Sequence, residues 1–214
     1  MQIKKIGHCC LIIKLEKITI LTDPGSFTTE YNKNIKNIDI VLITHEHNDH
    51  IHVESLKEII KNNPQVRIFT NTAVGKIIDG LNIKYEILEG LDKEEVLGVL
   101  IEAFDGNHEE VFENVGQVQN TGYFIDNKLF YPGDSYCDPK KKIEVLALPV
   151  AGPWCKVGDA IRYAIKLKPK KVFPVHDGML QIDKIGGAHK VPENVLKQYG
   201  INFIPMVSGD EQEF

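Results

Sequence analysis

Cysteine is scarce in this sequence, and its few positions follow no bridging pattern. Four cysteines occur among 214 residues, at Cys9, Cys10, Cys137 and Cys155, without a C-x-x-C pair. This spacing argues against a disulfide framework. Cys9 and Cys10 are expected to face opposite sides of a strand as small buried apolar residues, because free cysteine is among the most buried residue types.

Excess positive charge and long apolar runs are also missing. Lys and Arg total 25 against 30 Asp and Glu, which gives a net charge of −5. That balance argues against a nucleic-acid surface built on general electrostatics. No apolar run approaches the length of a membrane span, and the amino terminus lacks the plan of a signal peptide. We therefore expect a cytoplasmic protein with no membrane span and no nucleic-acid partner.

The remaining composition is ordinary for a globular protein. Hydrophobic residues make up 43% and charged residues 26% of the chain. A length of 214 residues fits one domain, residues 1–214, and allows that domain to be built from two similar halves.

Strand-like runs alternate with turn signals and with three helical segments, which are Val53–Ile60, 71–80 and 159–166. Apolar and β-branched runs predict strands at Ile3–Ile6 and Lys84–Leu88, and one continuous strand over Val96–Phe104. The segment Asp126–Lys128 is a turn-forming sequence between two further apolar runs, which predicts a hairpin.

A dense cluster of histidines follows one of these runs. His45, His47 and His50, together with Asp49, lie within six residues of a chain that holds eight histidines. Neutral imidazole nitrogens and anionic oxygens are metal donors. Packing them together has no folding benefit without a dication, which holds deprotonated donors in one place.

The flanking segments place this cluster on a loop at the carboxyl end of a strand. Ile38–Ile43 is an apolar run typical of a buried strand, and Val53–Ile60 has helical spacing. Ligand sites of α/β sheets usually lie at such strand ends. The alternative is a solvated loop whose histidines cap the following helix, a role that fits His52.

Other titratable residues also follow predicted strands. His108, Asp134 and His176 each appear where an apolar run stops. Asp23 stands at another strand end and is expected either to begin a turn or to accept the second N–H of a metal-bound histidine. His8 is similarly placed, and either lines the site or has a structural role.

The order and context of these residues carry a family resemblance. The stretch His45-x-His47-x-Asp49-His50, then His108, Asp134 in Gly-Asp-Ser and His176 in Pro-Val-His, resembles the metallo-β-lactamase superfamily. The opening Gly7–Ile13 and the turn Leu21–Pro24 look most like its small metal-dependent hydrolase branch. That branch includes ascorbate-6-phosphate lactonase-like proteins and the phospholipase D that releases N-acylethanolamines.

The resemblance implies an α+β fold, an αββα sandwich of two mixed sheets packed face to face with helices outside. It implies one metal on His45, His47 and His108, a second on Asp49, His50 and His176, and Asp134 bridging the two. Seven donors also exceed the needs of one ion, because a catalytic zinc commonly takes three protein ligands. We expect two divalent ions, with zinc favoured and manganese or iron as alternatives.

The implied activity is hydrolysis of an ester, lactone, amide or phosphodiester bond in a small substrate. A hydroxide bridging the two metals would attack, and Asp49 and Asp134 are the predicted catalytic residues. Two alternatives remain open on the same fold: an iron-dependent redox protein and a non-catalytic metal-dependent sensor. Asp134 and His176 are 42 positions apart, which leaves no room for the inserted domain of nucleic-acid-cleaving relatives.

Candidate pocket residues come from loops at the strand ends. His8 or Tyr136 could serve the leaving group, and Trp154 could wall the pocket, although both aromatic residues also suit plain packing. Cys155 would act as a soft ligand only if it points inward, and His189 is expected at the surface. The loops expected to set substrate specificity are 25–36, 109–120, 136–142 and 152–157. The lysines that would suit an anionic substrate, if they faced the site, are Lys33, Lys36, Lys140, Lys141 and Lys142.

Overall fold

The computed structural model describes residues 1–214, and most strands of its two sheets fall within apolar runs of the sequence. The first sheet has seven strands in the order β14-β1-β2-β3-β4-β5-β6. Its strands are β1 (Gln2–Gly7), β2 (Cys10–Lys14), β3 (Thr19–Thr22), β4 (Ile40–Leu42), β5 (Arg67–Thr70), β6 (Glu86–Ile87) and β14 (Glu211–Glu213).

The second sheet also has seven strands, in the order β13-β12-β11-β10-β9-β8-β7. They are β7 (Lys93–Val96), β8 (Val99–Asn107), β9 (Gln119–Ile125), β10 (Leu129–Tyr131), β11 (Val145–Pro149), β12 (Lys171–Val175) and β13 (Asn202–Phe203). Each sheet has three antiparallel pairings at one end, from β14 to β3 and from β7 to β10, and three parallel pairings at the other end. This arrangement is consistent with two similar halves.

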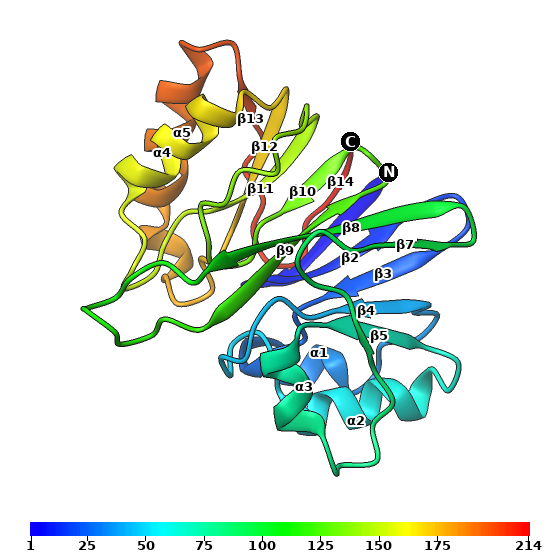
Figure 1. Cartoon of the computed structure of the whole chain (residues 1–214). Helices are drawn as coiled ribbons and strands as arrows, with labels where there is room; N and C mark the ends of the chain where they lie inside the picture. The colour runs from blue at the N-terminus through cyan, green and yellow to red at the C-terminus, as the bar shows by residue number, and fades with distance from the viewer.

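Helices cover the outer faces of the sheets, which gives the expected αββα layering (Figure 1). Helices α1 to α3 lie on the first sheet, and α4 and α5 lie on the second. Their bounds are α1 (Thr29–Asn32), α2 (Val53–Asn62), α3 (Thr72–Ile78), α4 (Val157–Leu167) and α5 (Gly186–Lys197). The predicted α+β sandwich of two mixed sheets is therefore confirmed.

The main hydrophobic core lies between the two sheets. Ile13 and Leu42 from the first sheet meet Tyr123 and Phe173 from the second, and all four side chains are fully buried. Burying a side chain of this size stabilises the fold by about 1.5–3 kcal/mol relative to leaving it in water. This rigid interior fixes the edge where the strand ends of both sheets meet.

Some local predictions need correction. The run Val96–Phe104 is not one strand, because Leu97 (φ 51°) and Gly98 (φ 85°) turn the chain back and form a hairpin between β7 and β8. Helix α5 was not expected, since it contains two adjacent glycines at its start and Pro192 within it. His189 lies on this helix and is buried at 5% exposure, so its predicted surface position is wrong.

The predicted helix after the histidine cluster is present as α2. The ring of His52 accepts a hydrogen bond from the Ser55 backbone N–H at 3.2 Å, and so caps the helix amino terminus. His52 therefore has the capping role, while the preceding histidines point elsewhere. None of the helices combines the length and the apolar character needed to cross a membrane.

Candidate metal centre

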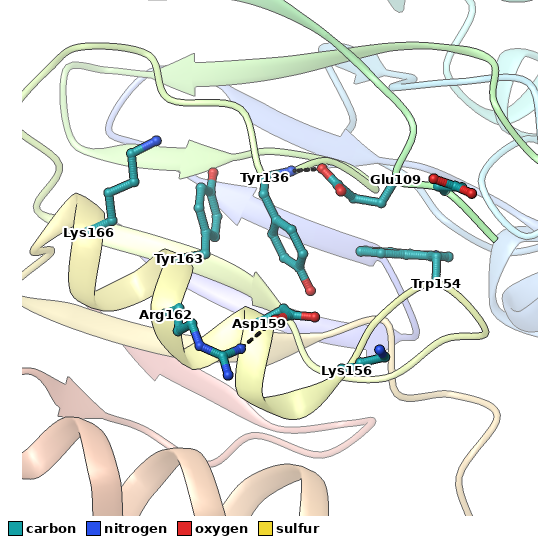
Figure 2. A pocket seen from close by; sticks show the side chains of 9 residues that line it. Glu109, Tyr136, Trp154, Lys156, Asp159, Arg162, Tyr163 and Lys166 are labelled. Carbon is teal, nitrogen blue, oxygen red and sulfur yellow. Dashed lines mark hydrogen bonds and ion pairs between the residues drawn. The ribbon is translucent and has the colours of Figure 1, made fainter. Parts of the chain in front are cut away.

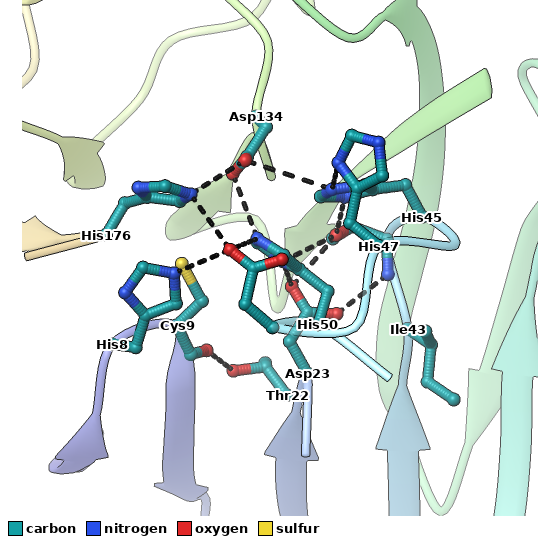
Figure 3. A network of polar contacts seen from close by, with 12 residues as sticks. His8, Cys9, Thr22, Asp23, Ile43, His45, His47, His50, Asp134 and His176 are labelled. Carbon is teal, nitrogen blue, oxygen red and sulfur yellow. Dashed lines mark hydrogen bonds and ion pairs between the residues drawn. The ribbon is translucent and has the colours of Figure 1, made fainter. Parts of the chain in front are cut away.

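The predicted donors come together at one edge of the sandwich, and Figure 3 shows His45, His47, His50, Asp134 and His176 there. Each follows the carboxyl end of a strand, so the two sheets supply them from opposite sides. His8 follows β1, Asp23 follows β3, the loop His45–His50 follows β4, His108 follows β8, Asp134 follows β10 and His176 follows β12.

Three of these residues have an unusual backbone conformation. His8, Asp23 and His176 have φ values of 50°, 37° and 61°, in the left-handed region that non-glycine residues rarely adopt. Such conformations cost free energy and cluster at functional sites. Here each one redirects a side chain from the end of a strand into the shared edge.

One group of donors contains three histidines. The ligand atoms of His45, His47 and His108 all lie within 4.8 Å of one another. His45 Nε2 and His47 Nδ1 are 3.2 Å apart. Several imidazole nitrogens therefore face a common point.

Asp134 lies beside this group and contacts histidines from both sheets. Its carboxylate oxygens are 3.8 Å from His45 Nε2, 3.3 Å from His50 Nε2, 3.3 Å from His108 Nε2 and 2.8 Å from His176 Nε2. Asp134 is 1% exposed, so solvent does not screen these contacts. Burial opposes ionisation, but His50 and His176 outweigh it and hold the pKa of Asp134 well below its usual value.

Hydrogen bonds fix which ring nitrogen of two histidines carries the proton. His176 Nδ1 lies 2.6 Å from the Ala151 carbonyl oxygen, and His108 Nδ1 lies 2.7 Å from the Glu109 carbonyl oxygen. A carbonyl only accepts, so each Nδ1 is the protonated nitrogen. In the neutral rings each Nε2 then turns a lone pair toward the anionic oxygens of Asp134. A cation between them removes this repulsion.

Asp23 occupies the outer position expected for an orienting carboxylate. Its Oδ2 accepts from His50 Nδ1 at 2.7 Å, from the Thr44 hydroxyl at 2.8 Å and from the Tyr131 hydroxyl at 2.5 Å. Thr44 Oγ1 in turn lies 3.0 Å from His45 Nδ1. Asp23 and Thr44 thereby orient His50 and His45 so that Nε2 of each points into the centre.

Sequence reasoning missed Thr44 and Tyr131. Tyr131 lies 108 positions from Asp23 in the chain, and its hydroxyl also donates to the Cys9 carbonyl at 2.9 Å. A tyrosine in an apolar strand gives no signal of such a contact. Thr44 directly precedes His45, and a hydroxyl residue at that position was the only available hint.

The charge balance differs between the two buried histidines of this loop. Burial alone lowers a histidine pKa, and it dominates at His45, whose pKa is well below the usual value. At His50 burial has the same sign, but Asp134 and Asp23 outweigh it and raise the pKa well above normal. His50 therefore prefers a positive charge close by, either a proton or a metal ion.

Asp49 and His8 form a pair on the more open side of the centre. His8 Nδ1 accepts the Gly178 N–H at 3.2 Å, so His8 carries its proton on Nε2, which lies 3.1 Å from Asp49 Oδ2. Burial lowers the pKa of His8 to about 4, although Asp49 opposes that shift, and the ring is neutral at pH 7. The exposed Phe27 stacks on it at 4.4 Å between ring centroids.

Asp49 also faces one histidine from each sheet. Its Oδ2 is 3.8 Å from His50 Nε2 and 3.6 Å from His176 Nε2. Burial opposes ionisation of Asp49, but the hydrogen bond from His8 and the nearby His50 depress its pKa below the usual range. A carboxylate and two imidazoles thus face one another here.

The donor chemistry fits divalent metal ions. His50 Nε2, His176 Nε2 and Asp134 Oδ1 are buried and have no hydrogen-bond partner. Buried polar atoms almost always have a hydrogen-bond partner, so three buried atoms without one in a single cluster indicate that a ligand binds among them. Nitrogen and carboxylate oxygen donors with outer-shell partners are typical of protein metal sites.

Comparison with known proteins agrees with this geometry. The family model described as the Beta-lactamase superfamily domain matches residues 2–176. The chain belongs to this superfamily. The resemblance predicted from its motifs is therefore confirmed.

Individual relatives cover most of the chain. A UPF0173 protein of Pyrococcus abyssi is 31% identical over 83% of this chain and 84% of its own length. A UPF0173 metal-dependent hydrolase of Nanoarchaeum equitans is 27% identical over 82% of this chain and 83% of its own. A crystal structure from Parabacteroides distasonis, described as a metal-dependent hydrolase, superposes with a TM-score of 0.77 at 25% identity, covering 95% and 91% of the two chains. The protein is thus a metal-dependent hydrolase.

A second buried polar cluster lies directly behind the metal centre of this hydrolase. Lys5 Nζ contacts Asp177 Oδ1 at 2.7 Å and the carbonyls of Pro174 and Met206 at 2.8 and 3.1 Å. His189 Nε2 lies 2.8 Å from Asp177 Oδ2. We call these residues the Lys5–Asp177–His189 cluster. Its contacts explain why His189 is buried. They also connect Asp177, the residue after His176, to β1 and α5.

A cavity of about 460 Å³ opens beside Trp154, and Figure 2 shows the side chains that line it. Its lining residues are Glu109, Glu110, Tyr136, Trp154, Lys156, Asp159, Arg162, Tyr163 and Lys166. Trp154 lines the cavity and also packs against the donors, with its ring centroid 5.5 Å from that of His108 and 5.3 Å from that of His176.

Three of the four predicted specificity loops reach this cavity. They contribute Glu109, Tyr136 and Trp154, whereas the loop 25–36 contributes Phe27 at His8 instead. None of the lysines suggested for an anionic substrate lines the cavity; its cations are Lys156, Arg162 and Lys166. Lys141 instead forms an ion pair with Glu102 on β8.

Tyr136 and Cys155 contact each other at the back of this cavity. The Tyr136 hydroxyl donates to Cys155 Sγ at 3.2 Å, and the thiol lies 3.5 Å from the Pro149 carbonyl oxygen. Burial raises the pKa of Cys155 to about 11, and it also raises the pKa of Tyr136 above its usual range. Cys155 is not among the clustered ligand atoms, so it does not face the metal centre.

Proposed function

We propose that this protein is a dinuclear metal hydrolase that cleaves an ester, lactone, amide or phosphodiester bond in a small substrate. One observation carries the proposal: the Nε2 atoms of His108 and His176, whose protons lie on Nδ1, face the buried carboxylate of Asp134 at 3.3 and 2.8 Å. Lone pairs and anionic oxygens this close repel each other unless a positive charge lies between them, which supports a metal ion at this position.

The proposed ligand sets follow the two sides of Asp134. His45, His47 and His108 hold one ion, and their mutual separations within 4.8 Å support this assignment. Asp49, His50 and His176 hold the second, supported by the 3.8 and 3.6 Å contacts of Asp49 with the two histidines. Asp134 contacts donors of both sets and bridges them.

Two such ions, when bound, supply a hydroxide at neutral pH and polarise the bond to be cleaved. The residues of this chain provide the orientation. His8 donates its Nε2–H to Asp49 and holds that carboxylate in one rotamer, from which the other oxygen can position the attacking group. Asp134, buried and ionised, keeps the donors of both sets at fixed separation.

We propose the cavity beside Trp154 as the substrate pocket. Its volume of about 460 Å³ suits a small molecule. Trp154 forms the wall toward the metal centre, and Tyr136, which keeps its proton at neutral pH, lies behind Trp154 with ring centroids 5.7 Å apart. His8 is neutral and its one N–H is held by Asp49, so it orients that carboxylate rather than protonating a leaving group.

Zinc is the proposed metal, with manganese or iron as alternatives, because nitrogen and carboxylate donors accept all three. The expected cytoplasmic location is also part of this proposal. It is supported by the four cysteines, all of which are free thiols in the structure. We further propose that nucleic acid is not a substrate, given the net charge of −5.

Metal analysis and a substrate panel on one sample test this proposal. The purified protein should hold two metal equivalents per chain and turn over at least one of a set of lactones, esters, amides and phosphodiesters. His47→Ala and His50→Ala should each remove one equivalent, since they belong to different ligand sets. A single equivalent in the wild type would contradict the dinuclear site. Iron together with oxygen consumption would instead identify a redox protein.

A further inference from the structure

The two adjacent cysteines of this chain have different surroundings. Cys10 packs in the apolar layer between the first sheet and its helices, and its thiol lies 3.9 Å from Asn32 Oδ1. Cys9, which is 1% exposed, lies on the opposite side, toward the metal centre. Figure 3 shows its sulfur beside the ring of His8 and below His176. The expectation that the pair faces opposite sides is met, but the description of Cys9 as a merely apolar residue is incomplete.

Cys9 Sγ belongs to a group of four potential ligand atoms. It and the ring nitrogens of His8, His50 and His176 all lie within 4.8 Å of one another. A zinc ion binds sulfur at about 2.3 Å and imidazole nitrogen at about 2.0 Å. At the tetrahedral angle, two such ligands of one ion are about 3.5 Å apart. The four atoms, which lie within 4.8 Å of one another, therefore need to close by about 1 Å to share an ion.

Hydrogen bonding removes His8 from this group and leaves Cys9. Both ring nitrogens of His8 are engaged, Nδ1 with the Gly178 N–H and Nε2 with Asp49. His50 Nε2 and His176 Nε2, in contrast, are buried and have no hydrogen-bond partner. The thiols of Cys10, Cys137 and Cys155 each have an oxygen acceptor, whereas the Cys9 thiol donates to none and lies next to the Tyr131 hydroxyl.

The backbone holds the Cys9 side chain in this position. Its carbonyl accepts hydrogen bonds from the Thr22 hydroxyl at 2.8 Å and from the Tyr131 hydroxyl at 2.9 Å. The left-handed conformation of His8 turns the chain just before it, so that consecutive side chains both reach the centre. The two hydroxyl hydrogen bonds and the turn at His8 thus direct the Cys9 thiol toward His50 and His176, whose Nε2 atoms have no hydrogen-bond partner.

We propose that Cys9 Sγ is a ligand of the metal ion held by His50 and His176. This inference rests on the proposed dinuclear site and adds a soft donor to one of its two positions. On binding, the metal replaces the thiol proton, which leaves to solvent. A thiolate favours zinc or cobalt over manganese, so the two metal positions differ in selectivity.

Cobalt substitution tests the proposal without relying on activity. The protein loaded with two equivalents of Co²⁺ should show visible d–d bands and an intense near-ultraviolet thiolate-to-cobalt charge-transfer band. Cys9→Ser should lose the charge-transfer band while it keeps d–d bands. Cys10→Ser, a neighbouring and equally buried position, should keep both.

The outcomes separate this inference from the proposed function. Absence of all cobalt bands would refute the metal site itself. Wild-type protein with d–d bands but no charge-transfer band would overturn the Cys9 ligand alone, as would a band that survives in Cys9→Ser or disappears in Cys155→Ser. Should Cys9→Ser not fold, the variant with Cys10, Cys137 and Cys155 all changed to Ser decides: a retained band supports Cys9, and a lost band refutes it.

Discussion

Two buried polar clusters lie back to back in this molecule and meet at the consecutive residues His176 and Asp177. In the Lys5–Asp177–His189 cluster the charges are paired, with Lys5 bound to Asp177 and to two carbonyls. In the metal centre, His50 Nε2, His176 Nε2 and Asp134 Oδ1 have no hydrogen-bond partner. Because buried polar atoms are normally satisfied, the paired cluster can serve the fold alone, while the unpaired one requires a ligand.

The largest expected effect comes from removing the shared carboxylate of the metal centre. Asp134→Ala deletes the group that contacts His45, His50, His108 and His176. Changes to residues that only touch a metal ligand cost about 10- to 100-fold in metal affinity or activity, so this loss should exceed about 100-fold in kcat/KM. Metal content should fall below two equivalents, measured by elemental analysis.

Asp138→Asn is the matched control for this prediction. Asp138 lies on the same loop but pairs with Lys140 and Lys166 at its partly exposed position, away from the donors. It should keep both metals and full turnover. If Asp134→Ala also kept two metals and wild-type turnover, the bridging assignment would be wrong.

In the paired cluster the expected effect is on stability. Lys5→Met leaves Asp177 buried with only the hydrogen bond to His189, and breaking a buried ion pair this way costs about 3–5 kcal/mol. The free energy of unfolding, measured with urea, should fall by that amount. Replacing Lys5 by Met and Asp177 by Leu together should recover part of the loss, because an apolar pair can substitute for a buried ion pair.

Lys4→Met provides the comparison on the neighbouring position of β1. Lys4 makes no ion pair and is only partly buried, so the substitution should change the free energy of unfolding by less than about 0.5 kcal/mol. An equal cost for Lys4→Met and Lys5→Met would show that the cluster has no special role in stability.

A smaller effect is expected where the metal centre is supported from outside. Asp23→Asn weakens the acceptor for His50 Nδ1 and for the Thr44 and Tyr131 hydroxyls. Metal affinity should fall by about 10- to 100-fold, measured by competition with a chromophoric chelator. Asp39→Asn is the control, because Asp39 also accepts a hydrogen bond in the first sheet, from Thr19 N at 2.8 Å, but is far from the donors. Unchanged affinity in Asp23→Asn would argue against its orienting role.

The sequence was sufficient to predict which titratable residues come together at the centre, because their signals are local. His45, His47, Asp49 and His50 lie in one short loop, and the later donors each stand at the end of an apolar run. The strand ends of a packed sandwich converge at one edge, so residues that directly follow strands come close together in the folded chain. The sandwich of two mixed sheets followed from the same pattern and its family resemblance.

The supporting contacts could not be predicted, because they join distant segments. Lys5 and Asp177 are 172 positions apart, and neither residue differs in sequence from an ordinary surface charge. Helix α5, which brings His189 to them, begins with two glycines and contains Pro192, so local propensity argued against it. Tertiary packing decided these features, and only the folded chain shows them.

The smallest effect concerns the response of the paired cluster to acid. Burial opposes ionisation of Asp177, but His189 and Lys5 outweigh it and lower its pKa below the unfolded value of about 3.9. Its contribution to stability is therefore complete above the unfolded pKa and is lost as the pH falls through the folded pKa. The free energy of unfolding should decrease with acid more steeply in the wild type than in Asp177→Asn, when both are measured with urea in the presence of a chelator.

The chelator matters because acid also releases metal, which would add a slope of its own. Asp49 and Asp134, whose pKa values are likewise lowered, are present in both proteins and contribute to both curves. The difference between the curves thus isolates Asp177. Identical slopes would mean that the charge of Asp177 is not coupled to folding, and the contrast between a paired structural cluster and an unpaired metal centre would then rest on packing rather than on charge.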